Sequence, residues 1–467
     1  MAMASLSVNQ ALDVAPLGAT RWKVWFLSAM GVFLDGFDLF IMAVALPVIQ
    51  HDLKPEPWML GLIGAAAPLG AVLGAAGAGR LTDRLGRKLL YVIDLTTFIA
   101  FALLSALAWN TWSLFAFRFM LGVGIGADYP ISSSYVSEFM PARIRGRMLV
   151  SSFSFQAIGS LVGAAIGLLI LVVHPDLDAW RWMLAAGILP ALLVAVLRSN
   201  LPESPRWCAA HGRTQEAAAI SSALSGCQVT VDSRPEPHLP YTALFSPPFL
   251  HRTILATVPW FLMDIGLYTI GFFTPTILAA MAFTGHGSWV AKDIASTEGA
   301  VFLDLFLVVG FGLAIWLVDR WGRIRLQMLG FAGMTIGLLL LVIAGGLPGG
   351  TQQHVPLVFF GFALFNLAVN AGPNATTFLL PAELFPTSLR ASGHGLAAAC
   401  GKVGAAFGLF VLPVLKQSLG LTPTLAFVAG ACFLGLLVTF AFQTETSGRS
   451  LEEISAVSMP PVAAAAA

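Results

Sequence analysis

Among the ionisable side chains inside long apolar stretches of this 467-residue sequence, five stand out as candidates for chemistry. Asp35, Asp38, Asp128 and Asp264 supply carboxylates, and Lys402 is the lysine that lies deepest in an apolar stretch. An ionisable group at bilayer depth costs about 2.5–3.5 kcal/mol on insertion scales, so it is a functional candidate by default. Several carboxylates and one ammonium group can together bind a small anion and exchange protons.

Asp35 and Asp38 lie three residues apart, on one face of a predicted helix. Repulsion between two close carboxylates and their burial both favour protonation of one of them, so the pair can carry a proton. The alternative is a structural ion pair with Arg118 or another cation. Asp128 follows Gly122-Val-Gly-Ile-Gly126, where small residues permit close helix contact. It can be a proton carrier or an acceptor that lines a cavity.

A buried ammonium such as that of Lys402 needs a carboxylate partner or an anionic ligand. We expect Asp264 and Lys402 to face one cavity, and the alternative is that they simply neutralise each other. Further polar side chains are expected to flank the two charges: Trp260, Tyr268, Tyr129, Gln156 and Asn374.

The elements that carry these groups are apolar segments of membrane-spanning length. Apolar residues make up 57% of the chain and charged residues only 10%, with a mean hydropathy of +0.82. About 20 residues of helix cross the hydrocarbon core of a bilayer. The predicted fold is an all-α polytopic membrane protein with twelve transmembrane helices in two pseudo-symmetric six-helix bundles. The predicted helices are 24–49, 57–79, 89–109, 112–136, 148–173, 180–200, 254–283, 295–318, 326–348, 354–381, 392–416 and 422–442.

Basic residues are distributed unevenly between the loops. With both termini on the inner side, 19 of the 25 Lys and Arg lie inside and four lie outside. This bias predicts cytoplasmic termini in a multi-pass protein of the cell (plasma or inner) membrane. The predicted parts are an N-terminal bundle (1–200), a cytoplasmic linker (201–250), a C-terminal bundle (251–445) and a tail (446–467).

Two short motifs recur in both halves. Asp-Arg-x-Gly-Arg occurs at 83–87 and 319–323, and a Glu followed seven residues later by Arg occurs at 138–145 and 383–390. The preference for positive charge on the cytoplasmic side explains the arginines of these motifs, but it does not explain the repeated Asp and Gly. We therefore expect the motif residues to form a gate by pairing with helix ends of the opposite half. The expected gate residues are Asp83, Arg84, Arg87, Glu138, Arg145, Asp319, Arg320, Arg323, Glu383 and Arg390.

These motifs resemble those of the major facilitator superfamily over nearly the whole chain. The segments 202–207 (Pro-Glu-Ser-Pro-Arg-Trp) and 444–454 resemble motifs of its sugar-porter-like branch, which carries many substrates. The segment 124–132 (Gly-Ile-Gly-Ala-Asp-Tyr-Pro-Ile-Ser) is similar to a signature of the phosphate:proton symporters. Segments around Asp264, Asn374 and Lys402 resemble further helices of that family.

The resemblance implies import of phosphate with protons by alternating access. Phosphate contacts would then be Tyr129, Gln156, Trp260, Asp264, Tyr268, Asn374 and Lys402. The aspartates tied to proton movement would be Asp35, Asp38 and Asp128. Dihydrogen phosphate suits such a site because it is an anion that also carries hydroxyl protons, which a carboxylate such as Asp264 can accept.

Other functions are left open by the residues themselves. One alternative is a proton symporter with the same architecture that carries an organic acid; a sugar is a less favoured cargo. The alternative from another class of protein is a membrane nutrient sensor. An enzyme is not expected, because the chain has no nucleophile–base arrangement, phosphate-cradling glycine loop or metal-ligand cluster. We expect no cofactor, no metal and no nucleic acid, and a monomer in the lipid bilayer, and the sequence does not assign a role to Asp304.

Overall fold

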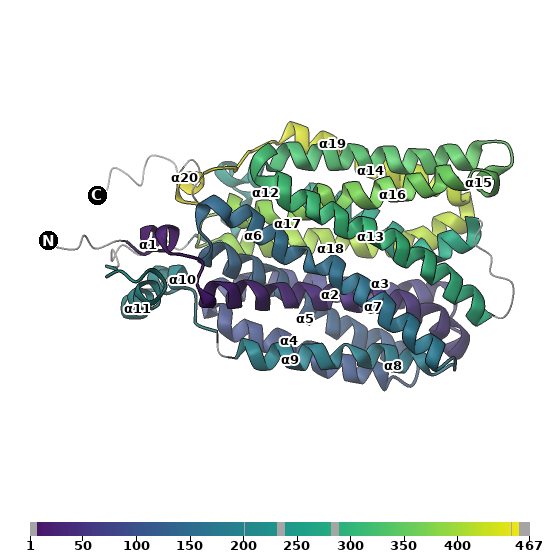
Figure 1. The fold of residues 1–467 in the computed structure, drawn as a ribbon, viewed down its shortest axis with the longest axis horizontal. Coiled ribbons are helices and arrows are strands. Elements are labelled where there is room, and N and C mark those ends of the chain that lie inside the picture. Colours follow the sequence, from purple (N-terminus) through teal and green to yellow (C-terminus); the bar gives the residue numbers. More distant parts are fainter. Residues whose placement is uncertain (1–6, 200, 231–238, 282–288, 450, 457–467) are drawn as a thin grey trace.

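The computed structural model describes residues 7–199, 201–230, 239–281, 289–449 and 451–456. Within these ranges the chain is helical and contains no strand, and its long helices lie side by side in an elongated bundle (Figure 1). The all-α fold predicted from the sequence is confirmed.

Each predicted membrane helix has a counterpart in the structure. In the first half these are α2 (Ala19–Leu53), α3 (Pro57–Leu85), α4 (Arg87–Ala106), α5 (Thr111–Phe139), α6 with α7 (Arg145–Phe153, Phe155–Val173) and α8 with α9 (Ala179–Ala186, Ile188–Arg198). In the second half they are α12 (Pro247–Met281), α13 (Trp289–Trp321), α14 (Arg323–Gly346), α16 with α17 (Val355–Ala371, Pro373–Leu384), α18 (Arg390–Leu419) and α19 (Leu421–Ala441). Eleven apolar spans long enough to cross a membrane occur among the described residues. The twelfth prediction falls on α13, where part of the side chains, including that of Asp304, lies outside the described residues.

Three spans are interrupted where the sequence suggested continuous helices. The breaks are at Ser154, Gly187 and Gly372. At Gly372 the backbone leaves helical geometry (φ −128°, ψ −99°), and the helix restarts with Pro373 in its first turn. Proline has no N–H to donate and is favoured at the start of a helix. The break therefore places Asn374 at the beginning of a new helical segment.

The first and last described helices, α1 (Val8–Val14) and α20 (Leu451–Ala456), lie at one end of the bundle (Figure 1). The same end carries α10 (Pro205–Ala210) and α11 (Thr214–Ser225), and we call it the terminal face. The small helix α1 was not predicted from the sequence. The domain boundaries drawn from the sequence stay predictions.

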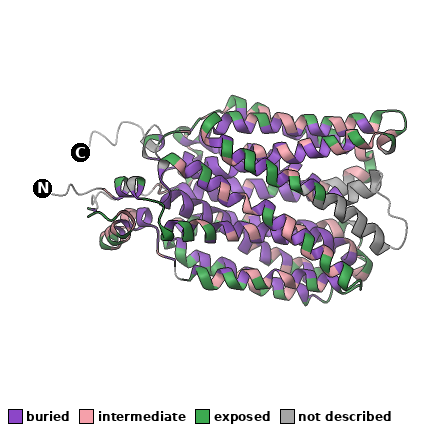
Figure 2. Ribbon diagram, in the orientation of Figure 1, coloured by how far each residue is buried: buried purple, intermediate pink, exposed green. Residues whose placement is uncertain are grey.

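Burial is inverted relative to a water-soluble protein. Exposed side chains on the outside of the bundle include large apolar ones, such as Leu189 at 77% exposure and Val173 at 72% (Figure 2). Charged side chains, including Asp35, Arg118 and Lys402, are buried inside. An apolar exterior around a polar interior is expected where lipid, rather than water, surrounds the helices.

Close helix contacts depend on the glycines that precede Asp128. A Cβ at Gly122 would collide with the backbone of Ala67, and one at Gly126 with the backbone of Ala71. Small residues let α3 and α5 approach this closely. This confirms the packing role expected for the glycine run and fixes the height of Asp128 in the bundle.

Candidate functional site

Lys402 lies at the centre of a polar cluster that joins the two halves. Its side chain on α18 is buried, and the ammonium donates hydrogen bonds to the hydroxyls of Tyr129 (2.8 Å) and Tyr268. Its carboxylate partner is Asp35 on α2, with 3.8 Å between Nζ and Oδ2. One cation therefore holds together α2 and α5 of the first half and α12 and α18 of the second.

Asp35 gathers the polar side chains of the first half. Its Oδ2 accepts hydrogen bonds from the Tyr129 hydroxyl and from Gln156 Nε2 (2.9 Å). The Gln156 amide oxygen in turn accepts a hydrogen bond from Asn374 Nδ2 (3.3 Å) across the interface between the halves. The hydrogen-bond network continues to Asn370, whose amide oxygen accepts a hydrogen bond from Asn374 Nδ2 (2.6 Å). The break at Gly372 sets this geometry, because it positions Asn374.

Asp264 and Trp260 lie on α12, and both are buried. The indole of Trp260 is a hydrogen-bond partner of the Asp264 carboxylate. The second carboxylate oxygen, Oδ2, is buried and has no hydrogen-bond partner among the described residues. A buried acceptor without a partner carries a desolvation cost, which a ligand that donates a hydrogen bond would remove. This oxygen is the clearest unused acceptor near the cluster.

Asp38 makes a different contact from Asp35, although the two share a helix face. Arg118 on α5 donates two parallel hydrogen bonds to it, Nη1 to Oδ1 at 2.6 Å and Nη2 to Oδ2 at 2.8 Å. Both side chains are buried, and this two-pronged geometry is the strongest form of an Arg–carboxylate pair. The structural ion pair considered as an alternative is therefore the arrangement present in this structure.

The central cavity is small in this conformation. Its volume is about 20 Å³, and its lining includes Asp35, Asp38, Arg118, Tyr268 and Lys402. One water molecule needs about 10–15 Å³ on the same measure. The polar groups therefore contact one another around a space for about one water, and a larger ligand requires them to separate.

A second buried cluster surrounds Asp128. Arg198 Nη1, at the end of α9, lies 2.8 Å from Asp128 Oδ1 and 3.4 Å from Asp94 Oδ2. A Cβ at Gly31 would displace the ends of the Arg198 and Asp128 side chains, so glycine at this position leaves room for their ion pair. Neither Asp94 nor Arg198 is among the site residues predicted from the sequence. The sequence contained one signal for each residue. Arg198 is an ionisable residue near the end of one apolar segment, and Asp94 is an ionisable residue within another.

Ion pairs close the terminal face between the halves. Asp83 Oδ2 accepts hydrogen bonds from the backbone N and the hydroxyl of Ser392, both at 2.8 Å, in the first turn of α18. A carboxylate is favoured there by the helix dipole and the free N–H groups. Glu138 pairs with Arg87 (2.7 Å) in its own half and with Arg390 (3.4 Å) across the interface.

The second copy of the motif makes a related set of contacts. Arg323 pairs with Glu383 (3.2 Å) and Asp319 (3.0 Å). Asp319 also reaches across to Arg147 of the first half at 3.2 Å. Neither Arg147 nor Ser392 was identified from the sequence, because neither belongs to the repeated pattern.

Three of the expected gate residues have other surroundings. Arg84 lines a cavity at the terminal face, and Arg320 lies over the Trp316 ring at 4.8 Å. Arg145 donates to the Ser137 carbonyl (3.1 Å) and lies 4.0 Å from Asp13 of α1.

The two sugar-porter-like motifs occupy equivalent positions. Glu203 accepts hydrogen bonds from the backbone N–H of Arg87 (3.1 Å) and Lys88 (3.2 Å), at the start of α4. Glu445 does the same for Arg323 (3.0 Å) and Ile324 (3.1 Å), at the start of α14. Each glutamate thus caps the helix that follows a repeated motif. This correspondence supports two halves with one internal architecture.

A family model described as "Sugar (and other) transporter" matches residues 24–457. The chain belongs to this family. Its fold is that of the major facilitator superfamily. The proton:xylose symporter XylE, in a structure with bound 6-bromo-6-deoxy-D-glucose, has a TM-score of 0.79 and 21% sequence identity, covering 94% of this chain and 99% of XylE.

Curated relatives of the family are similar over nearly the whole length. The probable inorganic phosphate transporter 1-6 of Arabidopsis thaliana is 33% identical, with 97% of each chain covered. The putative metabolite transport protein YaaU of Escherichia coli is 31% identical, covering 91% of this chain and 92% of YaaU. The chain is accordingly a membrane transporter of this family and not an enzyme.

Proposed function

We propose that the protein imports inorganic phosphate together with protons by alternating access. The observation that carries this proposal is the Lys402 cluster, a buried cation joined to side chains from both halves. A ligand bound there contacts both halves at once, so its binding and release are tied to their relative movement. The phosphate transporters among the relatives support the choice of anion.

The bound anion would take over contacts that the side chains now make with one another. Phosphate oxygens would accept hydrogen bonds from Lys402, Tyr129 and Tyr268, which converge in the cluster. Gln156 and Asn374 would add amide donors, and Trp260 would add its indole N–H. The unpartnered oxygen of Asp264 would accept a hydrogen bond from a hydroxyl group of dihydrogen phosphate. Sulfate has no such proton at neutral pH, so Asp264 would repel it.

Charge balance gives a reason for proton coupling. The cluster contains one cation, Lys402, and two carboxylates, Asp35 and Asp264, while Asp38 and Arg118 neutralise each other. An anion entering this buried site would add a third negative charge against one positive charge, at a high cost in the membrane interior. Protonation of one carboxylate removes that cost. Phosphate and a proton would then bind together more readily than either alone.

Two further carboxylates are proposed to take part in proton movement. Asp38 would do so by exchanging its ion pair with Arg118 for a proton. Asp128 shares Arg198 with Asp94, so two acids compete for one buried cation. Two carboxylates facing one guanidinium leave a net negative charge, which a proton bound to either acid would neutralise.

We place the terminal face in the cytoplasm, as the distribution of Lys and Arg predicts. Closure of this face by Asp83, Glu138 and Asp319 would then belong to the state in which the cytoplasmic gate is shut. Its opening would release phosphate into the cell.

The second candidate is proton symport of an organic anion. A carboxylate ligand could also bind Lys402, and YaaU is named as a putative metabolite transporter. Uptake of labelled phosphate into proteoliposomes, with sulfate and small carboxylates as competitors, distinguishes the two. Inhibition by arsenate but not by carboxylates is expected for a phosphate carrier. Stronger inhibition by a carboxylate than by arsenate would favour the second candidate.

A further inference from the structure

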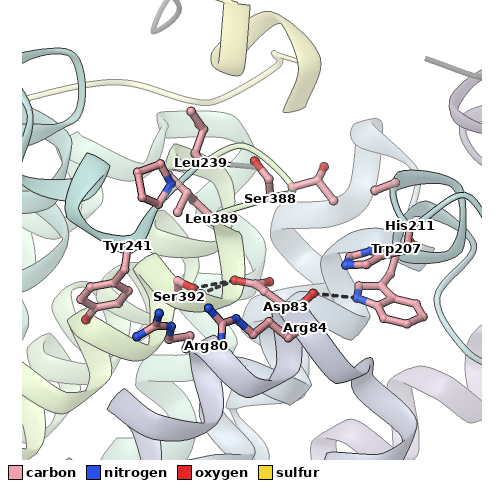
Figure 3. A pocket seen from close by; sticks show the side chains of 13 residues that line it. Arg80, Asp83, Arg84, Trp207, His211, Leu239, Tyr241, Ser388, Leu389 and Ser392 are labelled. Carbon is pink, nitrogen blue, oxygen red and sulfur yellow. Dashed lines mark hydrogen bonds between the residues drawn. The ribbon is translucent and has the colours of Figure 1, made fainter. Parts of the chain in front are cut away.

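A second cavity, of about 540 Å³, opens at the terminal face (Figure 3), and Lys402 does not line it. Its walls come from the end of α3, from α10, from the linker before and at the start of η2 (Tyr241–Phe245), and from 387–392 at the start of α18. Small-molecule sites typically measure about 300–1,000 Å³. Unlike the central cavity, this one has room for a metabolite without any rearrangement.

Two arginines give the cavity a positive charge. Arg80 and Arg84 lie one helical turn apart on α3, and no ion pair of either appears among the described contacts. Like charges at this spacing repel each other, and an anion between them would remove that repulsion. Asp83 also lines the cavity, but its carboxylate is held by Ser392 and lies 3.6 Å from Arg87. The arginine charges therefore stay available to a ligand.

Neutral groups surround the arginines. Figure 3 shows Tyr241 and Arg80 at one side of the cavity, and Trp207 with His211 at the other. Burial raises the pKa of the Tyr241 phenol, so its hydroxyl stays a neutral donor at physiological pH. Ser388 adds a further hydroxyl, and Leu239 an apolar wall. Cations, hydroxyl groups and apolar surface together suit an organic phosphate better than a bare ion.

We propose that this cavity is a regulatory site for a small phosphorylated metabolite, whose phosphate group binds between Arg80 and Arg84. The arginines belong to the first half, whereas Ser388 and Ser392 belong to the second. A ligand that touches both halves binds best while the hydrogen bonds between Asp83 and Ser392 hold them together. It therefore stabilises the state in which the terminal face is closed.

The consequence is that a ligand bound from the terminal-face side inhibits transport. This inference rests on the gate of the proposed function, but it does not depend on which substrate is carried. Accumulated phosphorylated product inside the cell would slow further uptake, because a gate held shut cannot release its cargo.

The first test measures binding of glucose 6-phosphate and pyrophosphate to the full-length protein by calorimetry. The variants are Arg80→Gln with Arg84→Gln, and separately Ser388→Glu, which places a negative charge in the cavity. Arg325→Gln is the matched control, because Arg325 is an exposed arginine that does not line the cavity. A Lys402→Ala variant removes the central cation and leaves this cavity intact.

We expect at least one of the two probes to bind the wild type, the control and the Lys402 variant with similar affinity. Loss of charge-assisted contacts should weaken binding to the double arginine variant and to Ser388→Glu about ten-fold or more. Absence of binding to the wild type at millimolar concentration, or equal binding to all variants, would overturn the proposal. So would loss of binding in Lys402→Ala, since the probe would then occupy the central site.

A second measurement tests regulation. Proteoliposomes are loaded with the bound probe, and exchange of the transported substrate is followed in those molecules whose terminal face points inward. The probe should slow exchange by the wild type, and slow it much less in the double arginine variant. Equal exchange rates with and without the probe in the wild type would contradict a regulatory role. Failure of phosphate uptake itself, with probe binding intact, would count against the proposed cargo and not against this site.

Discussion

Neutralising one member of the Asp38–Arg118 pair should destabilise the protein more than neutralising both. The two hydrogen bonds of 2.6 and 2.8 Å connect charges that are both buried. Removing one partner of such a pair typically costs about 3–5 kcal/mol, because the other charge stays buried without compensation. Asp38→Asn and Arg118→Gln should each lose about that much, and the double variant should lose less than either.

The assay is unfolding of the purified protein by titration with a denaturing detergent, carried out on the wild type, the two single variants and the double variant. The coupling free energy should exceed about 1.5 kcal/mol. Asp178→Asn is the control for loss of an acidic charge, since Asp178 is exposed, and it should change stability by less than about 0.5 kcal/mol. Additive losses in the double variant would refute the reasoning that the pair is stabilised by mutual compensation.

The same double variant separates structure from proton coupling. If Asp38 serves only to neutralise Arg118, the folded double variant should accumulate substrate normally. Since we propose that Asp38 also exchanges its ion pair for a proton, we expect the double variant to exchange substrate but to accumulate little of it. Normal accumulation would remove Asp38 from the proton pathway.

Four other variants test the coupling residue, the binding site and the gate. Asp35→Asn should keep phosphate exchange but abolish accumulation driven by a proton gradient, and accumulation at the wild-type level would exclude Asp35 as a coupling residue. Lys402→Ala and Asp264→Asn should each weaken phosphate binding measured by calorimetry by about 30-fold or more, because each removes a charged partner worth about 2–3 kcal/mol; affinity within a few-fold of the wild type would contradict the site assignment. Asp83→Asn should weaken closure of the terminal face, so that a cysteine introduced at Ser388 reacts faster with an impermeant maleimide applied from that side, and an unchanged labelling rate would count against the gate.

The sequence predicted the long elements well, because a bilayer demands segments of a set length and apolar composition. It predicted neither the interruptions at Ser154 and Gly187 nor the small helix α1. These features depend on local packing, which a hydropathy pattern does not contain. The break at Gly372 was readable in principle from the Gly-Pro pair.

The partners of the buried charges were harder to predict than their presence. Spacing places Asp35 and Asp38 on one helix face, yet they bind Lys402 and Arg118 respectively. The three-residue step moves Asp38 about 4.5 Å further along α2. On α5 it therefore meets Arg118, whereas Asp35 meets Tyr129 and, from α18, Lys402. Arg198 was not predicted as a site residue, because it lies near the end of the apolar segment 180–200, but its long side chain reaches back to Asp128. Only the packed helices fix such pairings.

The most direct test of the proposed function is uptake of labelled phosphate into proteoliposomes under an imposed inward proton gradient, with and without an uncoupler. We expect accumulation above equilibrium that the uncoupler abolishes, that arsenate blocks and that sulfate leaves unchanged. Protein that folds correctly but neither accumulates phosphate nor exchanges it would contradict the assignment of phosphate as the cargo. Accumulation that persists with the uncoupler would contradict proton coupling.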